Sequence, residues 1–230
     1  MSDSAPRPMI RVTKDGPYRL DGAVPISKQI IATDEAGESV DWQEGERFAE
    51  RASCALCRCG GSNLKPFCDG THASIAFDGT ETASTIPYAE AADRIGGPGI
   101  DLLDDLTLCA EARFCAAKGG AWHLVKQEDE ESCRTVRDEA ERCPSGRYTA
   151  IDHVTGLPQE PDLEPSIGLV EDPAASVSGP LWVRGGIPVV GSDGTAYEVR
   201  NRVTLCRCGA SKNKPFCDSA HVEIGFDAGD

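Results

Sequence analysis

The chain has 230 residues, 40% of them hydrophobic, and a formal net charge of −15 at pH 7. This acidity argues against nucleic acid and an anionic membrane surface as partners, because phosphate groups are bound by basic patches. The N-terminus lacks the apolar core of a signal peptide, and no stretch is long and apolar enough to span a bilayer, so we expect a cytoplasmic protein with no membrane partner.

Residues 1–12 are expected to form an N-terminal tail, and a first module follows at residues 13–85. The Gly-Pro pair at 16–17 predicts a turn that leads into a short strand. After Pro25, a stretch rich in Glu, Asp and Gly predicts a surface loop. A further strand is expected to end at the first cysteine motif, so the module should be mainly β.

The first module carries three cysteines and a histidine with the spacing C-x-C-x8-C-x3-H in residues 57–72, here called the first loop. The candidate ligands are Cys57, Cys59, Cys68 and His72. Three thiolates and one imidazole on so short a loop are able to converge on one metal centre. The tight C-x-C pair suits one iron of a two-iron cluster, with the later Cys and His on the other iron. A Cys3His zinc site is the alternative. Disulfides are a further alternative for the eleven cysteines.

Four other residues of this region have predicted roles. Ser62 is expected to stabilise a turn and Asp69 to cap a short helix, and both are assigned to the cofactor-binding loop. Arg58 either shields charge at the metal centre or is solvated. Cys54 aligns with Val203 of a second copy of the loop, so we interpret it as a core residue and not as a ligand.

The middle segment (residues 86–157) has a different character. Apolar residues between 100 and 108 lead to a cysteine-bearing turn. Residues 130–142 predict an amphipathic helix that ends at a Cys-Pro pair, and residues 147–151 predict a strand.

Three cysteines of the middle segment form the pattern C-x5-C…C-P; they are Cys109, Cys115 and Cys143. Three thiolates suit a 3Fe-4S cluster, or a 4Fe-4S cluster whose fourth iron has another ligand. Cys133 is a candidate for that ligand, but it shares a helical face with apolar residues, which favours a buried structural cysteine. His123 and His153 are interpreted as ordinary surface or core histidines.

Residues 158–178, rich in Pro and acidic residues, are expected to form a linker to a second module at residues 179–227. That module repeats the spacing of the first loop in residues 206–221, the second loop. Its candidate ligands are Cys206, Cys208, Cys217 and His221. The matching positions Ser211, Asp218 and Arg207 have the roles predicted for their counterparts in the first loop.

The first loop contains the full pattern C-x-C-x2-S-x3-P-x-C-D-G-x-H, and both loops resemble the CDGSH iron-sulfur family. The resemblance implies one 2Fe-2S cluster in each loop, with the C-x-C pair on the inner iron and the later Cys and His on the outer, more exposed iron. An imidazole in place of a thiolate raises the reduction potential. It also makes the site pH-sensitive, because the ligating nitrogen must stay deprotonated.

The second loop departs from the family at Ser219, where glycine is usual. A serine is acceptable there if φ is negative, whereas a positive φ costs roughly 1 kcal/mol or more. We expect both clusters to bind and to differ in lability.

The middle segment resembles the divergent single-cluster bacterial ferredoxins that lack the middle cysteine of C-x2-C-x2-C, with Ala112 at the vacant position. Fusions of such a segment with CDGSH repeats occur in bacteria, which suggests a bacterial source. The expected fold class is α+β: two small, mainly-β CDGSH modules forming an intrachain pseudo-dimer, plus an inserted small α+β ferredoxin-like domain. This follows from resemblance to the mitoNEET type, in which two chains form a homodimer. We expect a monomer with an internal pseudo-two-fold axis, and pairing of each repeat with another molecule is the alternative.

These features predict an iron-sulfur protein with two 2Fe-2S clusters, and one 3Fe-4S or 4Fe-4S cluster in the middle segment. The expected role is one-electron transfer or redox and pH sensing, with a redox protein as partner. No catalytic constellation accompanies the clusters, so we do not expect an enzyme. A carrier that donates its cluster to an apo-protein is the alternative, and a structural zinc protein is the third hypothesis.

Overall fold

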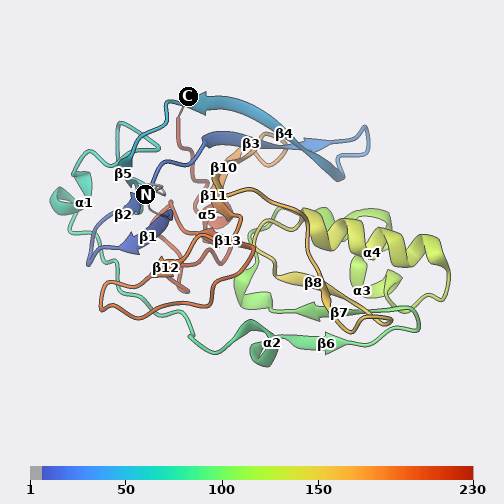
Figure 1. Cartoon of the computed structure of the whole chain (residues 1–230). Helices are drawn as coiled ribbons and strands as arrows, with labels where there is room; N and C mark the ends of the chain where they lie inside the picture. The colour runs from blue at the N-terminus through green and yellow to red at the C-terminus, as the bar shows by residue number, and fades with distance from the viewer. Residues whose placement is uncertain (1–6, 230) are drawn as a thin grey trace, which may run out of the picture.

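Two β-sheets of the protein draw strands from both ends of the chain (Figure 1). The structure is a computed structural model that describes residues 7–229. The four-stranded sheet has the order β12-β1-β2-β5, and the five-stranded sheet has the order β13-β11-β10-β3-β4. The strands of the first sheet are β1 (Met9–Val12), β2 (Tyr18–Asp21), β5 (Ser53–Leu56) and β12 (Val189–Val190). Those of the second are β3 (Ile26–Thr33), β4 (Ser39–Phe48), β10 (Ser166–Asp172), β11 (Val177–Arg184) and β13 (Arg202–Leu205).

Each of these sheets contains a strand from the other end of the chain. Strand β12 pairs in parallel with β1, where Val189 lies opposite Ile10. Strand β3 pairs in parallel with β10, where Ile26 lies opposite Ile167. Parallel neighbours need long connections, and here the chain between the two modules supplies them. The two ends of the chain therefore cannot separate without breaking both sheets.

Side chains of both sheets form one hydrophobic core. Tyr18 and Leu56 from the first sheet and Leu181 and Leu205 from the second are fully buried members of it. The registers match, because Tyr18 pairs with Leu56 as Leu181 pairs with Leu205. Burial of apolar surface is the main favourable term in folding, so the shared core couples the stability of the two sheets.

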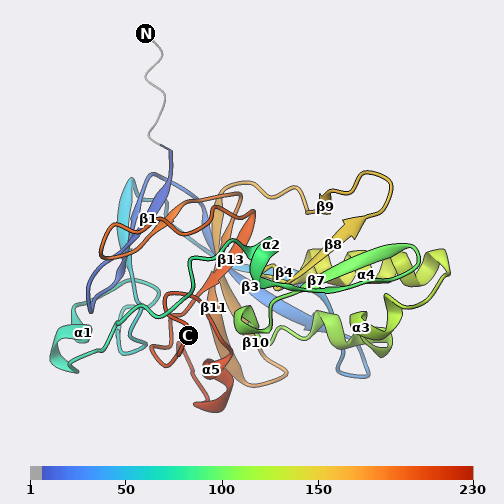
Figure 2. The same cartoon turned by 90° about the horizontal axis from the view of Figure 1, so that it is seen from below.

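The middle segment and the two residues that follow it form a third sheet with the order β6-β7-β8-β9. Its strands are β6 (Asp93–Ile95), β7 (Ile100–Asp104), β8 (Tyr148–Asp152) and β9 (Pro158–Gln159), and its helices are α2 (Tyr88–Ala91), α3 (Ala121–Leu124) and α4 (Glu130–Arg142). Short 3-10 turns occupy Leu106–Leu108 and Phe114–Gly119. Val136 and Ala140 pack α4 against β7 and β8, and Figure 2 shows α4 beside these strands. The predicted helix at 130–142 is confirmed.

The predictions for the N-terminal tail and for the linker are wrong. The tail predicted for residues 1–12 includes β1, because Ile10 and Val12 are buried in the shared core; residues 1–6 of that prediction lie outside the described residues. The linker predicted for residues 158–178 includes β10, whose Ile167 and Leu169 are buried. The prolines and acidic residues at the start of that stretch obscured its apolar second half.

The surface loop predicted after Pro25 is also wrong, because this stretch forms the hairpin of β3 and β4. Trp42 on β4 packs against Trp182 and Phe114, with ring centroids 4.8 and 5.0 Å apart. Most other side chains of β4 are exposed, since it is the edge strand. Its acidic composition therefore reflects one solvated strand and not a loop.

The predicted α+β composition is confirmed, with more strand than helix. Cys54 lies on β5 and packs against the shared core, as the alignment of the two copies predicted. Within residues 7–229, none of the helices has the length and apolar character needed to cross a bilayer.

Candidate metal centres

Strands β5 and β13 lead directly into the first cysteine of the two loops, and each loop folds back onto its strand. The backbone N–H of Cys57 donates to the carbonyl of Pro66 (2.8 Å), and that of Cys68 donates to Ala55 (2.8 Å). The second loop repeats both bonds at 2.9 Å, from Cys206 to Pro215 and from Cys217 to Thr204. The local fold thus brings the C-x-C pair and the later cysteine together in both copies.

The serine and aspartate of the first loop bind backbone groups, although Gly70 and not Asp69 occupies the N-cap position of the short helix. Ser62 Oγ donates to the carbonyl of Phe67 (2.6 Å). Asp69 accepts from the N–H groups of Thr71, at the start of α1 (Thr71–Ser74), and Asn63, each at 2.9 Å. These hydrogen bonds, first those from Thr71, hold the pKa of Asp69 well below its usual range. The second loop repeats the arrangement with Ser211 bound to Phe216, and Asp218 bound to Lys212 and to Ala220 at the start of α5 (Ala220–Glu223).

The candidate ligands of the two loops lie in pairs. Cys57 Sγ and Cys59 Sγ are 3.9 Å apart, and Cys68 Sγ lies 3.3 Å from Nδ1 of His72. The corresponding distances in the second loop are 3.6 Å between the paired thiols and 3.5 Å between thiol and imidazole. In residues 7–229, no group of three or more His, Cys, Asp or Glu is close enough to hold one metal ion.

These distances fit ligands that share one tetrahedral iron. Two thiolates at about 2.3 Å from a tetrahedral metal lie about 3.8 Å apart, and a thiolate and an imidazole lie about 3.5 Å apart. Each loop therefore offers one ligand pair for each iron of a two-iron cluster. In both loops Nδ1 is the histidine nitrogen that faces the cysteine thiol.

The arginine between the paired cysteines is buried in each loop, with Arg58 1% and Arg207 4% exposed. Arg58 donates to the carbonyl of Gly79 (2.5 Å). Arg207 donates to the carbonyl of Gly179 (2.6 Å) and to Glu171 Oε1 (2.7 Å). The alternative that these arginines are solvated is therefore wrong. They tie the loops to neighbouring backbone.

The two loops differ in exposure and in one backbone position. His221 is 4% exposed, whereas His72 is half-buried. Burial and the nearby charge of Arg207 lower the pKa of His221 to about 4. Ser219 has a φ of 70°, in the left-handed region that Gly70 occupies with a φ of 92°. The second loop therefore contains the positive φ that the sequence comparison identified as costly for serine.

The C-x-C pairs of the two loops meet back to back. Cys59 and Cys208 form an isolated antiparallel β-bridge. A Cβ added to Gly60 would lie 2.5 Å from the carbonyl oxygen of Cys208, so this contact requires glycine. Tyr18 also crosses between the modules, and its hydroxyl donates to the carbonyl of Cys206 (2.8 Å). Sequence reasoning missed Tyr18, which occupies the strand position that Leu181 occupies in the second copy.

The three cysteines of the middle segment line one small cavity. Burial raises the pKa of Cys115 to about 12, and the charge of Cys143 adds to this effect. Arg147 Nη1 donates to Cys109 Sγ (3.3 Å) while its Nε donates to Asp104 (2.7 Å). Three thiols around one cavity fit a cluster held by three cysteines. Sequence reasoning missed Arg147, since a lone arginine gives no signal.

The remaining candidate residues of the middle segment lie elsewhere. Cys133 packs against the core around Ile100 and does not line the cysteine cavity, as expected for a structural cysteine. His153 Nε2 lies 2.9 Å from a carboxylate oxygen of Asp101. His123 Nε2 lies 3.4 Å from the side-chain amide nitrogen of Gln127 at the surface.

The middle segment also contacts the second loop. Asn213 Nδ2 donates to the carbonyl of Thr107 (3.0 Å). Burial raises the pKa of Cys217 well above its usual value, and among the nearby charges that add to it is that of Cys109. The turn that precedes Cys109 is therefore in contact with the second loop.

Comparisons with known families agree with this geometry. Residues 15–73 and 178–222 match the family of iron-binding zinc fingers of CDGSH type. Residues 95–153 match the family described as divergent 4Fe-4S mono-cluster. No curated protein and no solved structure gives a significant match to the chain.

Proposed function

We propose that this chain, an iron-sulfur protein with two segments of the CDGSH-type family and one of the divergent 4Fe-4S mono-cluster family, acts in one-electron transfer or redox sensing. In this proposal each loop holds a 2Fe-2S cluster through three cysteines and one histidine. The middle segment holds a 3Fe-4S or 4Fe-4S cluster through Cys109, Cys115 and Cys143.

The pairing of the ligands is the observation that carries the proposal. A zinc ion of the Cys3His kind needs its four ligands gathered around one point. In both loops the thiol pair and the thiol-imidazole pair instead stand as two separate pairs, each with the spacing of ligands on one tetrahedral iron. This favours a two-iron cluster over zinc.

When bound, a 2Fe-2S cluster supplies a one-electron couple. The protein tunes that couple through groups that face the ligands. The backbone N–H groups of Gly61 and Gly70 donate to Cys59 Sγ and Cys68 Sγ, each at 3.4 Å. Hydrogen bonds to ligand sulfur stabilise negative charge and favour the reduced form. Arg147 makes the corresponding contact to Cys109 in the middle segment.

The exchanged strands and the back-to-back loops support an intrachain pseudo-dimer. We propose that the protein is a monomer with an internal pseudo-two-fold axis and that the middle segment is a ferredoxin-like domain. We also propose that the protein lies in the cytoplasm and catalyses no reaction of its own. The partner is then a redox protein.

Iron and sulfide analysis together with EPR spectra of the oxidised and reduced protein tests this proposal. The expected result is two 2Fe-2S signals and one signal from a 3Fe-4S or 4Fe-4S cluster. Zinc without iron, and a protein without visible absorption, would reject it. Absorption spectra of the Cys109→Ser variant assign the third signal to the middle segment.

A cluster carrier is the second candidate function, favoured by the exposure of one ligand pair. Cys68 and His72 are half-buried, so an acceptor protein has access to them. Incubation with an apo-ferredoxin separates the two functions. Transfer of iron and sulfide faster than electron exchange with an oxidised one-electron carrier would identify a cluster donor, and the reverse order would identify an electron carrier.

A further inference from the structure

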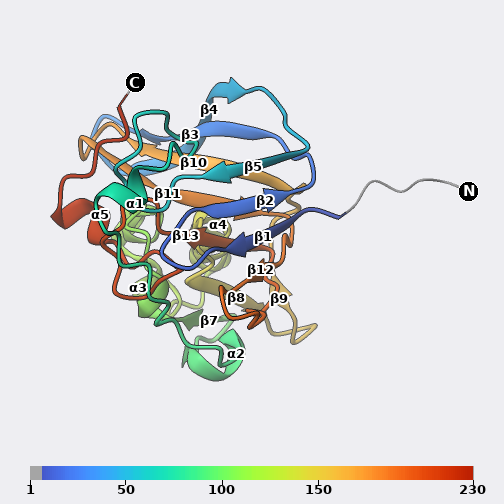
Figure 3. The ribbon, with the colours of Figure 1, turned by 90° about the vertical axis from the view of Figure 1, so that its left-hand side faces the viewer.

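The three candidate sites lie in a row with the second loop in the middle. Figures 1 and 2 both show α5, which carries His221, between α1, which carries His72, and the helices of the middle segment. This spatial order differs from the order along the chain, in which the middle segment separates the two loops. Figure 3 shows α1 and β5 on the side that faces away from α4.

Neighbouring sites in this row are in direct contact. The first and second loops share the β-bridge between Cys59 and Cys208. A Cβ added to Gly209 would lie 2.7 Å from the carbonyl oxygen of Cys59, so the two backbones touch there. On the other side of the second loop, Asn213 binds the carbonyl of Thr107, two residues before Cys109.

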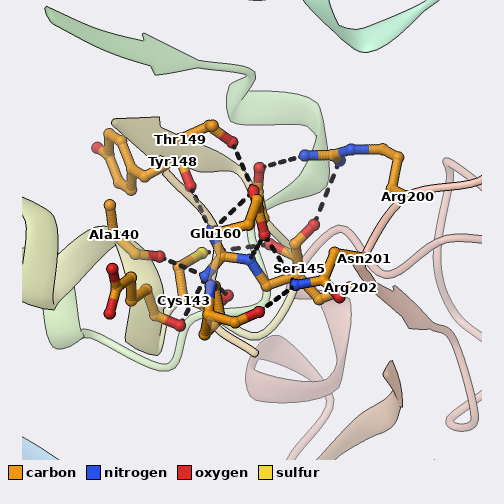
Figure 4. Close-up of polar contacts among 12 residues, drawn as sticks. Ala140, Cys143, Ser145, Tyr148, Thr149, Glu160, Arg200, Asn201 and Arg202 are labelled. Carbon is orange, nitrogen blue, oxygen red and sulfur yellow. Dashed lines mark hydrogen bonds and ion pairs between the residues drawn. The ribbon is translucent and has the colours of Figure 1, made fainter. Parts of the chain in front are cut away.

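Two arginines fix the middle segment against the five-stranded sheet. Arg113, between Cys109 and Cys115, forms an ion pair with the buried carboxylate of Asp172 on β10. Arg202, at the start of the strand that leads to Cys206, is 1% exposed. It donates to the carbonyls of Glu141 (2.7 Å) and Cys143 (2.9 Å) and to Glu160 Oε2 (2.9 Å), as Figure 4 shows for its labelled partners. The second loop and the middle cysteines therefore belong to one rigid unit.

The matched positions of the two loops differ in what covers them. Asn213 in the second loop is held by the middle segment, whereas Leu64 at the matching position of the first loop is 64% exposed. Beyond the histidines the two loops are alike, since Ile75 is 51% and its match Ile224 is 54% exposed. The outer face of the first loop is therefore open at a place where the second loop is covered.

We infer that the second loop is an interior link of a three-site electron relay, whose two ends are the first loop and the middle segment. The inference rests on the proposed function and adds to it a division of roles. A reduced one-electron carrier loses one electron at one end, and an oxidised one-electron carrier gains one electron at the other, so the chain returns to its starting redox state. Electron transfer slows steeply with distance. Electrons therefore pass between neighbouring sites faster than directly between the first loop and the middle segment.

Pulsed EPR on the reduced wild-type protein tests the order of the sites without any variant. The expected result is strong magnetic coupling of the second-loop cluster to both other clusters and the weakest coupling between the first loop and the middle segment. Coupling of the first loop to the middle segment that equals or exceeds the other two would overturn the inference.

A matched pair of double variants tests the link itself. Cys208→Ser with Cys217→Ser empties the second loop, and Cys59→Ser with Cys68→Ser empties the first loop. Rapid-freeze EPR after photoreduction with less than one electron per molecule follows exchange between the two clusters that are left. Electron exchange between the first loop and the middle segment should be lost when the second loop is empty. Electron exchange between the second loop and the middle segment should be kept when the first loop is empty. Unchanged signals of the two other clusters show that each variant has folded.

The outcomes separate this inference from the proposed function. A wild-type protein without three clusters fails the proposed function, and the relay fails with it. A protein with three clusters that exchanges electrons equally fast in both double variants keeps its electron-transfer function, and only the relay is rejected.

Discussion

At residue 219 and its match, residue 70, the two loops share a left-handed backbone but carry different residue types. Ser219 has a φ of 70°, while Gly70 at the matching position has a φ of 92°. A left-handed backbone costs a residue with a Cβ about 1 to 2 kcal/mol, and glycine avoids this cost. A Cβ added to Gly70 meets nothing within 4 Å, so backbone conformation alone decides the effect of a substitution there.

We expect Ser219→Gly to raise the stability of the second loop by about 1 kcal/mol, and Gly70→Ser to lower that of the first loop by a similar amount. The rate of bleaching of the cluster absorption at mildly acidic pH measures both effects. Ser219→Gly should slow the second-loop component and Gly70→Ser should accelerate the first-loop component. Equal rates in wild type and both variants would contradict the prediction.

Glu139 on α4 is a second residue whose environment has a measurable consequence. It is 5% exposed, and neither carboxylate oxygen has a hydrogen-bond partner. Burial raises the pKa of Glu139 to about 8, although the charges of Lys118 and Arg142 oppose the shift. The folded protein therefore keeps a proton that the unfolded chain releases at its usual, lower pKa.

Because only the folded protein holds this proton, the free energy of unfolding falls as the pH rises towards 8. The contribution of Glu139 is fully favourable below the pKa of the unfolded chain and is lost as the pH passes the folded pKa. Glu139→Gln removes the dependence, so its advantage over wild type should grow between pH 6 and 8, level off above that, and reach at least about 1 kcal/mol. Thermal unfolding across this range measures it. Glu131→Gln, on the exposed face of the same helix, is the control and should show no such trend.

At the scale of elements, the contact between α4 and β13 depends on one buried arginine. Arg202 donates hydrogen bonds to the carbonyls of Ala140 and Glu141 at the C-terminal end of α4, where helix carbonyls lack partners four residues on. Positive charge is also favourable at this end of a helix. Glu160 completes the site, so the guanidinium is paired although it is buried. The contact joins a strand of the second module to the helix that precedes Cys143.

We expect Arg202→Met to lower the free energy of unfolding by about 3 to 5 kcal/mol, because it removes the charged partner of Glu160 and hydrogen bonds to several buried carbonyls. Arg202→Lys should recover only part of this loss, since an ammonium group lacks the planar fork of donors. Arg11→Ala is the control, because its ion pair with Asp21 is half-exposed and contributes at most about 1 kcal/mol. Chemical denaturation measures all three. Equal effects of Arg202→Met and Arg11→Ala would contradict the prediction.

At the scale of the whole molecule, the candidate ligands and the main core are separate structures. The shared core contains side chains of both large sheets, and the ligand loops lie at the ends of β5 and β13. Metal binding contributes folding free energy to the segments that hold the ligands. The sheets have a second source of stability in the apolar surface that they bury.

Removal of iron by a chelator in the presence of a reductant should therefore loosen the loops before the sheets. Limited proteolysis of the iron-free protein is expected to cleave within residues 57–72, which are the more exposed of the two loops, and then within residues 206–221. The far-UV circular dichroism of the sheets should change little. Complete unfolding on iron removal, or resistance of both loops to protease, would contradict this expectation.

The local features of the chain were predictable because they depend on nearby residues. The loop spacing placed Cys57 to His72 correctly in pairs, and Ser62 and Asp69 form hydrogen bonds to residues at most six positions away. The helix at 130–142 followed from its apolar face and its ending at a Cys-Pro pair. The repeat itself excluded Cys54 from the ligands.

The sequence by itself determined the candidate ligand residues, the local folding of each loop and the families that the segments match. Only the tertiary structure decided the exchange of β3 and β12, the covering of the second loop and the order of the three sites. These features depend on pairings such as Ile10 with Val189 and Arg202 with Glu141, between residues far apart in the chain. These long-range pairings are selected because they bury apolar surface of distant segments against each other. The local pattern of residues does not show which distant segments will pack together.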